Sequence, residues 1–364
     1  MESGMKIEKT KAFTIIELMV SIFLTITVIA SFYKLYESSL KTERTASIRV
    51  SVNLLGEQIL DTIADSMRLI GLNSEVGDLQ TTDTAFGILR GTPSGGTGTE
   101  HVSFNYISPY GSPITKLQES ASGTYPACTF KLFNSAAFHS NITKLYIHNQ
   151  QGVYVTKKIG APTYSGNNAI LVSESFYNPT DDGDKWNWMS ADDNKTCAQR
   201  FPAGTLVSGE DFFYSLTYIH PKTLTLTYRA LNAEGTPTGA TNELINFEYA
   251  GNANQTFQIP LFVLEFLKEV YNDDVEERTW VTTFTPEERN NIVAVRFGFV
   301  LLSLKERVTA EDAGAAPTMS NLYCVFTDNV NNCYELTDLK YTASVFNRVV
   351  YLANFRLLKD QVNK

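Results

Sequence analysis

The chain has 364 residues, of which 43% are hydrophobic and 19% charged, so it can build a sizeable core and is not disordered by composition. Its formal net charge of −9 argues against broad nucleic-acid binding, which requires a basic face. The aromatic share of 12% favours β-structure.

Residues 13–32 are the most distinctive segment of the sequence. A leader with three lysines, residues 1–12, precedes the apolar run FTIIELMVSIFLTITVIASF, whose one charged residue is Glu17. A helix of 20 residues is about 30 Å long, which matches the hydrocarbon core of a bilayer. We therefore expect a transmembrane helix over residues 13–32, with the basic leader on the cytoplasmic side.

Two ordinary explanations compete for this segment. A secretory signal peptide could be cut after Ala30, but its apolar stretch is normally shorter, about 7–15 residues, and has no carboxylate. A plain signal anchor fits the length. It leaves Glu17 unexplained, because a carboxylate within a membrane span costs free energy.

Residues 11–20, KAFTIIELMV, are similar to the class III signal of type IV prepilins. The resemblance implies that a prepilin peptidase cuts between Ala12 and Phe13 and methylates the new amino terminus at Phe13. It also implies that Glu17 takes the assembly role of the family's glutamate. The family usually has glycine where this chain has Ala12, which is also small.

The helical pattern continues beyond the membrane span. Apolar residues recur every three or four positions from Ile48 to Ile70, and charged residues such as Glu57 and Asp61 fall off this stripe. We expect one long helix over residues 13–70 whose second half packs on a head. A membrane anchor followed by an ordinary helix would give the same pattern.

Residues 71–364 are expected to form a β-rich head. Strand-like runs follow one another with little helix between them, which indicates antiparallel sheets. The predicted strands are 101–107, 129–133, 144–148, 153–157, 169–173, 212–219, 223–229, 243–249, 257–266, 280–284, 292–303, 322–326 and 341–355. The predicted fold class is α+β: a long N-terminal helix, transmembrane in its first half, packed on an antiparallel, pilin-like head.

Four further segments resemble PilW-like minor pilins and the J-type pseudopilins of type II secretion. They are EQILDTIADSMRLIGL (57–72), ELINFEY (243–249), NIVAVRFGFVLLS (291–303) and FNRVVYLAN (346–354). Arg296 stands where the family usually has arginine. Residues 105–205 match nothing in the family, so we expect an insertion there.

The resemblance implies a minor pilin that helps to initiate a type IV pilus and caps it. The chain would enter the bacterial inner membrane with its head in the periplasm and then join a pilus or pseudopilus at the cell surface, at its tip. Its partners would be other minor and major pilins or pseudopilins, the prepilin peptidase and the inner-membrane assembly platform, with no nucleic acid. The alternatives are a type II secretion pseudopilin of the J type, or a tip adhesin that binds a surface ligand.

The sequence lacks the HExxH, GxSxG, Walker and GxGxxG motifs, so we do not expect an enzyme. The four cysteines all follow the span and none has C-x-x-C spacing; they are Cys128, Cys197, Cys324 and Cys333. A translocated head lies where disulfides persist. Cys324–Cys333 would then close a short loop and Cys128–Cys197 would link the insertion, although other pairings and free thiols stay open.

Residues 178–194, NPTDDGDKWNWMSADDN, combine two tryptophans with five aspartates: Asp181, Asp182, Asp184, Asp192 and Asp193. Clustered carboxylates in a glycine-containing loop can hold Ca²⁺, and an exposed tryptophan beside aspartate can bind a sugar or a protein. The spacing is not that of an EF-hand. A solvated acidic loop is therefore the favoured interpretation, with Ca²⁺ as the weaker alternative and no other cofactor expected.

Overall fold

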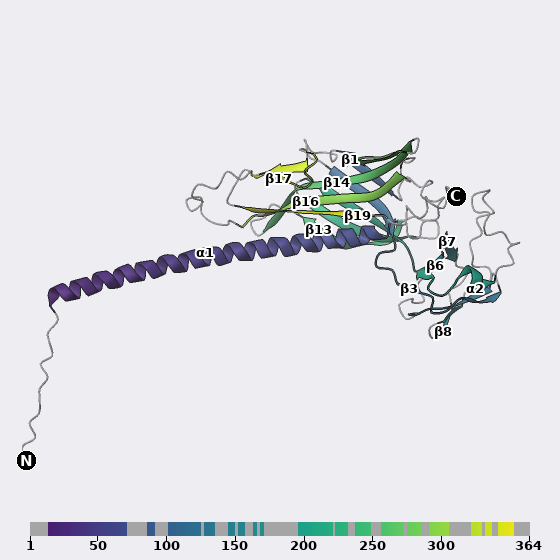
Figure 1. Ribbon diagram of the computed structural model, residues 1–364, viewed down its shortest axis with the longest axis horizontal. Helices are drawn as coiled ribbons and strands as arrows, with labels where there is room; N and C mark the ends of the chain where they lie inside the picture. Colours follow the sequence, from purple (N-terminus) through teal and green to yellow (C-terminus); the bar gives the residue numbers. More distant parts are fainter. Residues whose placement is uncertain are drawn as a thin grey trace, which may run out of the picture.

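The computed structural model describes residues 14–70, 86–91, 101–124, 127–134, 145–149, 152–156, 163–165, 168–170, 196–220, 223–231, 237–248, 256–272, 275–285, 288, 291–305, 322–329, 332–336 and 341–352. The predicted fold class is confirmed: a long N-terminal helix is followed by a head of antiparallel sheets (Figure 1).

The helix α1 (Ile15–Arg68) has 54 residues and is therefore about 80 Å long. It lies within the predicted range of 13–70. Its first half projects from the head, and its second half packs along it (Figure 1). The stripe predicted from Ile48 onward faces the head, where Val52 and Ile63 are fully buried.

Two sheets form the larger part of the head. The five-stranded β11 sheet has the order β1-β2-β11-β12-β13 and consists of β1 (Phe86–Gly91), β2 (His101–Ser108), β11 (Phe212–Ile219), β12 (Thr223–Leu231) and β13 (Pro237–Glu248). The four-stranded β14 sheet has the order β15-β14-β16-β19 and consists of β14 (Phe257–Asn272), β15 (Val275–Val281), β16 (Ile292–Ser303) and β19 (Thr342–Tyr351). All neighbours pair antiparallel.

One apolar core joins these two sheets to α1. Alternate residues of β2 point inward, and the ring of Phe104 meets Phe266 of β14 with 5.1 Å between centroids. α1 contacts β13 and β19, the edge strands of the two sheets, so it closes one side of the sandwich. We call α1 and this sandwich the body.

The chain leaves the sandwich between β2 and β11 and forms a smaller unit, which we call the module (residues 109–211). Its elements are β3 (Ile114–Lys116), β4 (Ser122–Thr124), β5 (Ala127–Lys131), β6 (Leu145–Asn149), β7 (Gly152–Thr156), β8 (Thr163–Ser165), β9 (Asn168–Ile170), α2 (Cys197–Arg200) and β10 (Leu206–Ser208). They make two sheets, β3-β10-β6-β7 and β4-β5-β9-β8. The module covers most of the residues expected to be an insertion, and it lies at the end of the head away from the projecting half of α1 (Figure 1).

A hairpin of β17 (Leu322–Cys324) and β18 (Cys333–Glu335) covers the outer face of the β14 sheet. Val325 and Leu336, which flank its strands, pack against Val300 of β16. The β14 sheet is therefore buried on both faces, which explains the almost continuous burial of β16.

Several strand boundaries differ from the predicted ones. β14 runs to Asn272 instead of 266, and β15 spans 275–281 instead of 280–284. The longer strands carry charged residues that fit the sheet, because Glu269 and Arg278 lie opposite each other in register and form an ion pair of 2.9 Å. Residues 171–173 and 353–355 of two predicted strands lie outside the described residues.

Candidate functional site

The first turn of α1 is closed by a capping box. Thr14 is the N-cap: its hydroxyl oxygen accepts a hydrogen bond from the Glu17 amide at 3.3 Å. The Glu17 carboxylate in turn accepts from the Thr14 amide and from the Thr14 hydroxyl, both at 3.0 Å. This reciprocal arrangement satisfies amides that would otherwise lack partners at a helix start.

The first half of α1 exposes an apolar surface. Its large apolar side chains from Ile15 to Leu40 have exposed fractions between 46% and 79%. The helix contains a segment long and apolar enough to cross a membrane, and none of that segment is buried. An apolar surface of this size normally contacts lipid or another protein.

Several hydroxyl groups of this half bond back to the helix itself. Thr25 donates to the Ser21 carbonyl at 2.7 Å, Thr27 to the Phe23 carbonyl at 2.8 Å, and Ser31 to the Thr27 carbonyl at 2.8 Å. Such bonds to the preceding turn reduce the cost of placing a hydroxyl in lipid. These three hydroxyls therefore do not require a protein partner.

The second half of α1 packs on β19, and we call this contact the seat of the helix. Gly56, the only glycine between Phe13 and Ile70, lies against the ring of Phe346, which would overlap a Cβ at this position. Two residues further along β19, Arg348 pairs with Glu57 at 3.6 Å and with Asp61 on the next turn of the helix. A shape contact and an ion pair thus fix the helix against the same strand.

A buried hydrogen bond fixes the end of the helix. Ser66 donates to the Ile63 carbonyl at 2.7 Å, so the 2.6 Å contact between Ser66 Oγ and Tyr106 Oη is a bond that Tyr106 donates. Burial raises the pKa of Tyr106 well above its ordinary value. The neutral phenol is therefore the form that the fold holds.

A charged cluster lies beneath the β17–β18 hairpin. The Arg296 guanidinium donates to Glu265 at 2.6 Å and pairs with Asp328 at 2.7 Å, and Asn332 donates to Glu265 at 3.1 Å. The Arg296 guanidinium also lies over the rings of Trp280 and Phe326, 4.4 and 4.3 Å from their centroids. All these groups have partners, so the cluster holds the hairpin on the sheet.

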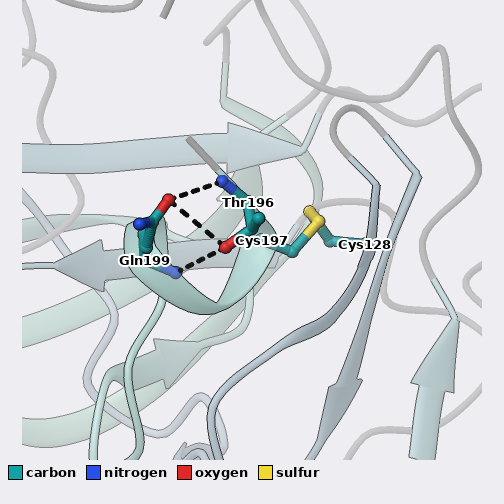
Figure 2. Close-up of a disulfide and its surroundings, with 4 residues drawn as sticks. All are labelled: Cys128, Thr196, Cys197 and Gln199. Carbon is teal, nitrogen blue, oxygen red and sulfur yellow. Dashed lines mark hydrogen bonds between the residues drawn. A yellow bond between two sulfur atoms is a disulfide. The ribbon is translucent and has the colours of Figure 1, made fainter. Parts of the chain in front are cut away.

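The structure joins Cys128 to Cys197 and Cys324 to Cys333, which are the two pairings named above from the sequence. Cys324 and Cys333 lie opposite each other in the β17–β18 ladder. Cys197 opens α2, whose Thr196 and Gln199 form a second capping box (Figure 2). Cys128–Cys197 lies within the module, and Cys324–Cys333 lies within the hairpin, which we count with the body.

The remaining predicted site residues lie outside the described residues. They are the processing residues Ala12 and Phe13 and the aspartates Asp181, Asp182, Asp184, Asp192 and Asp193. Within the described part of the chain, no group of three or more His, Cys, Asp or Glu side chains could hold a metal ion. The calcium hypothesis for residues 178–194 therefore stays untested.

Sequence reasoning missed three features of the site. The Thr14-x-x-Glu17 spacing is a capping-box signature and could have been recognised. A single glycine at position 56 of a long helix is a signal of close packing, but the sequence does not indicate that Phe346 is its neighbour. The pairing of Arg348 with Asp61 joins residues far apart in the sequence, and no local pattern indicates it.

No protein-family model matches the chain, and no curated protein matches it. Among solved structures, a type IV-like pilin from Thermus thermophilus is similar over 60% of this chain and 87% of its own, with 12% identity and a TM-score of 0.25.

Proposed function

We propose that this chain is a type IV minor pilin of the PilW-like kind. It enters the inner membrane through the first half of α1, is cut between Ala12 and Phe13, is methylated at Phe13, and helps other pilins to start a filament that it caps. The work is assembly rather than catalysis. A J-type pseudopilin would use the same helix and head and differs in the system that it joins.

The observation that carries the proposal is the contrast between the exposed first half of α1 and its buried second half. One unbroken helix buries its second half on the head and exposes its first half, which is long and apolar enough to cross a membrane. A subunit that passes from a bilayer into a filament needs such a surface, because lipid covers it first and neighbouring helices cover it later. The prepilin-like residues 11–20 lie where this exposed half begins.

The capping box bears on the role proposed for Glu17. A cut before Phe13 makes Thr14 the first residue with a peptide amide, and Glu17 already accepts from that amide at 3.0 Å. The carboxylate therefore lies at the positive end of the helix dipole, and the amide that it bonds belongs to the residue directly after Phe13, which would carry the new cationic amine. Both Thr14 bonds use Oε2, so the carboxylate can accept a further bond from the amine of a neighbouring subunit through Oε1.

The first test is chemical. N-terminal peptide analysis of the membrane-bound protein should find N-methyl-Phe13, and a bulky residue in place of Ala12 should block the cut. A mature chain that begins at Ser31 would instead establish a secretory signal peptide.

The second test separates the charge of Glu17 from its capping role. Glu17→Leu should insert and be cut normally, since the span becomes more apolar, but it should co-purify less with partner pilins and give fewer filaments. Glu17→Gln keeps an acceptor for the Thr14 amide and loses the charge. If pairing with an amine is the role, Gln should behave as Leu does.

Assembly of Glu17→Gln at the wild-type level, with Glu17→Leu defective, would reduce the residue to a helix cap. Assembly of both variants at the wild-type level would leave only the anchoring function of this half.

A further inference from the structure

The module has a core of its own. The fully buried Phe130 and Phe201 meet edge to face with 5.2 Å between ring centroids, and the Cys128–Cys197 disulfide lies in the same unit. Other buried residues of the module are Leu117, Ala121, Leu132, Ile147 and Val207. Among the described residues, neither core cluster of the body includes a side chain between Tyr110 and Phe212.

The two units are joined through a short neck, formed by residues 109–113 and 209–211. The Gly209 amide donates to the Pro113 carbonyl at 3.0 Å, and the Tyr214 hydroxyl donates to the Tyr110 carbonyl at 2.5 Å. A Cβ on Gly209 would lie 2.5 Å from Ser112 Oγ. The neck is therefore closely packed and holds the module in a defined place.

The two body strands that flank the module, β2 and β11, pair directly with each other. β2 and β11 pair along their whole lengths, and the last residue of β2, Ser108, lies directly opposite the first residue of β11, Phe212. Direct partners in an antiparallel pair can be joined by a two-residue turn such as Asn-Gly. The strands that pack most closely on α1, namely β13, β16 and β19, all follow Phe212 in the sequence, and Tyr106 of β2, which bonds Ser66 of α1, precedes the module.

We propose that residues 109–211 form an autonomous module that assembly does not require. The body alone then carries membrane insertion and docking to other pilins, and the module carries a separate role at the far end of the head. The statement about assembly rests on the proposed function, whereas the statement about autonomous folding does not.

The direct experiment replaces residues 109–211 by Asn-Gly in the otherwise complete chain. The variant should form the Cys324–Cys333 disulfide, unfold cooperatively within a few degrees of the wild type, and co-purify with partner pilins at the wild-type level. A head that is degraded, or that loses this disulfide, would overturn autonomous folding. A folded variant that no longer co-purifies would overturn dispensability.

A second experiment keeps the chain complete and needs no deletion. Phe201→Ala removes a buried ring of the module, so amide hydrogen exchange should rise at least tenfold in residues 114–208 and stay unchanged in β14, β16 and β19. The matched control is Phe104→Ala, which removes a buried ring of the body and should raise exchange in β14 and β16. Increased exchange of the body strands in Phe201→Ala would show that the two units fold together and would overturn the proposal.

The proposed assembly function and the proposed autonomy of the module can be contradicted independently of each other. If Glu17→Leu and Glu17→Gln assemble like the wild type, the assembly role of the exposed helix is wrong, but the exchange results still decide the autonomy of the module. If only the deletion variant fails to co-purify, the assembly role stands and the module is part of it.

Discussion

The two halves of α1 are both rich in apolar residues but have opposite surroundings. In the second half, Val52 and Ile63 are fully buried against the sandwich, whereas in the first half Ile15 is 79% exposed. A pattern of apolar residues therefore predicts that a surface is shielded from water, but not whether lipid, the head or another protein shields it. That distinction comes from the specific contacts of each half.

The second half is held by shape, charge and a hydrogen bond. Gly56 receives Phe346, Arg348 pairs with Asp61, and Tyr106 donates to Ser66. In the described part of the first half, the hydroxyls of Thr25, Thr27 and Ser31 bond back to the helix, and the large apolar side chains are exposed. Head stability should therefore depend on the second half alone, which the following variants examine.

Among the substitutions in α1, Gly56→Leu should have the largest effect. The new side chain overlaps the ring of Phe346, which is stacked on Phe299 at 5.4 Å and has little room to move. Overpacking of this kind costs about 1–3 kcal/mol, and we expect the upper end of that range in the free energy of unfolding of the head. Chemical denaturation in detergent would measure it, with the exposed Leu54→Ala as the control.

A double variant makes this prediction sharper. Phe346→Ala alone should cost about 3–5 kcal/mol, but Gly56→Leu in that background should cost less than it does in the wild type, because the obstructing ring is gone. Additive costs would show that the two positions do not interact.

Tyr106→Phe should cost about 1 kcal/mol at neutral pH, because it removes one buried hydrogen bond. The raised pKa of Tyr106 means that the phenol stays neutral in the fold but titrates near its ordinary value of 10.0 once unfolded. This contribution to stability is complete below pH 10.0 and is lost as the pH rises above it. The cost of Tyr106→Phe should therefore shrink above that pH, and a constant difference between variant and wild type would refute the linkage.

Arg348→Gln should have a smaller effect. Both of its carboxylate partners are more than half exposed, and exposed ion pairs contribute about 0.2–1 kcal/mol. The loss should appear at low salt and fade at high salt, because solvent ions screen the pair. Arg68→Gln is the matched control: its partner, Asp65, lies on α1 itself, so the variant should leave the seat on β19 unchanged.

The sequence was informative where one pattern repeats over a long element. The stripe of Ile48, Val52, Ile59 and Ile63 was predicted and is buried, because helical periodicity accumulates over many turns. The three-residue strands of the module, such as β3 and β10, are too short to show periodicity. The seat of α1 depends on pairs far apart in the chain, which no local window contains.

Thr14→Ala should have the smallest effect on the head. It removes the hydroxyl that accepts from the Glu17 amide at 3.3 Å, so the first turn of α1 should fray and exchange its amides faster. Thr14→Ser keeps the cap and should leave that exchange unchanged. Since the described contacts between helix and head begin near Ile48, more than thirty residues further along α1, the unfolding midpoint of the head should be the same in both variants. A lower midpoint in Thr14→Ala alone would mean that order at the start of the helix is transmitted to the seat on β19, and the two halves of α1 would then have to be treated as one cooperative element.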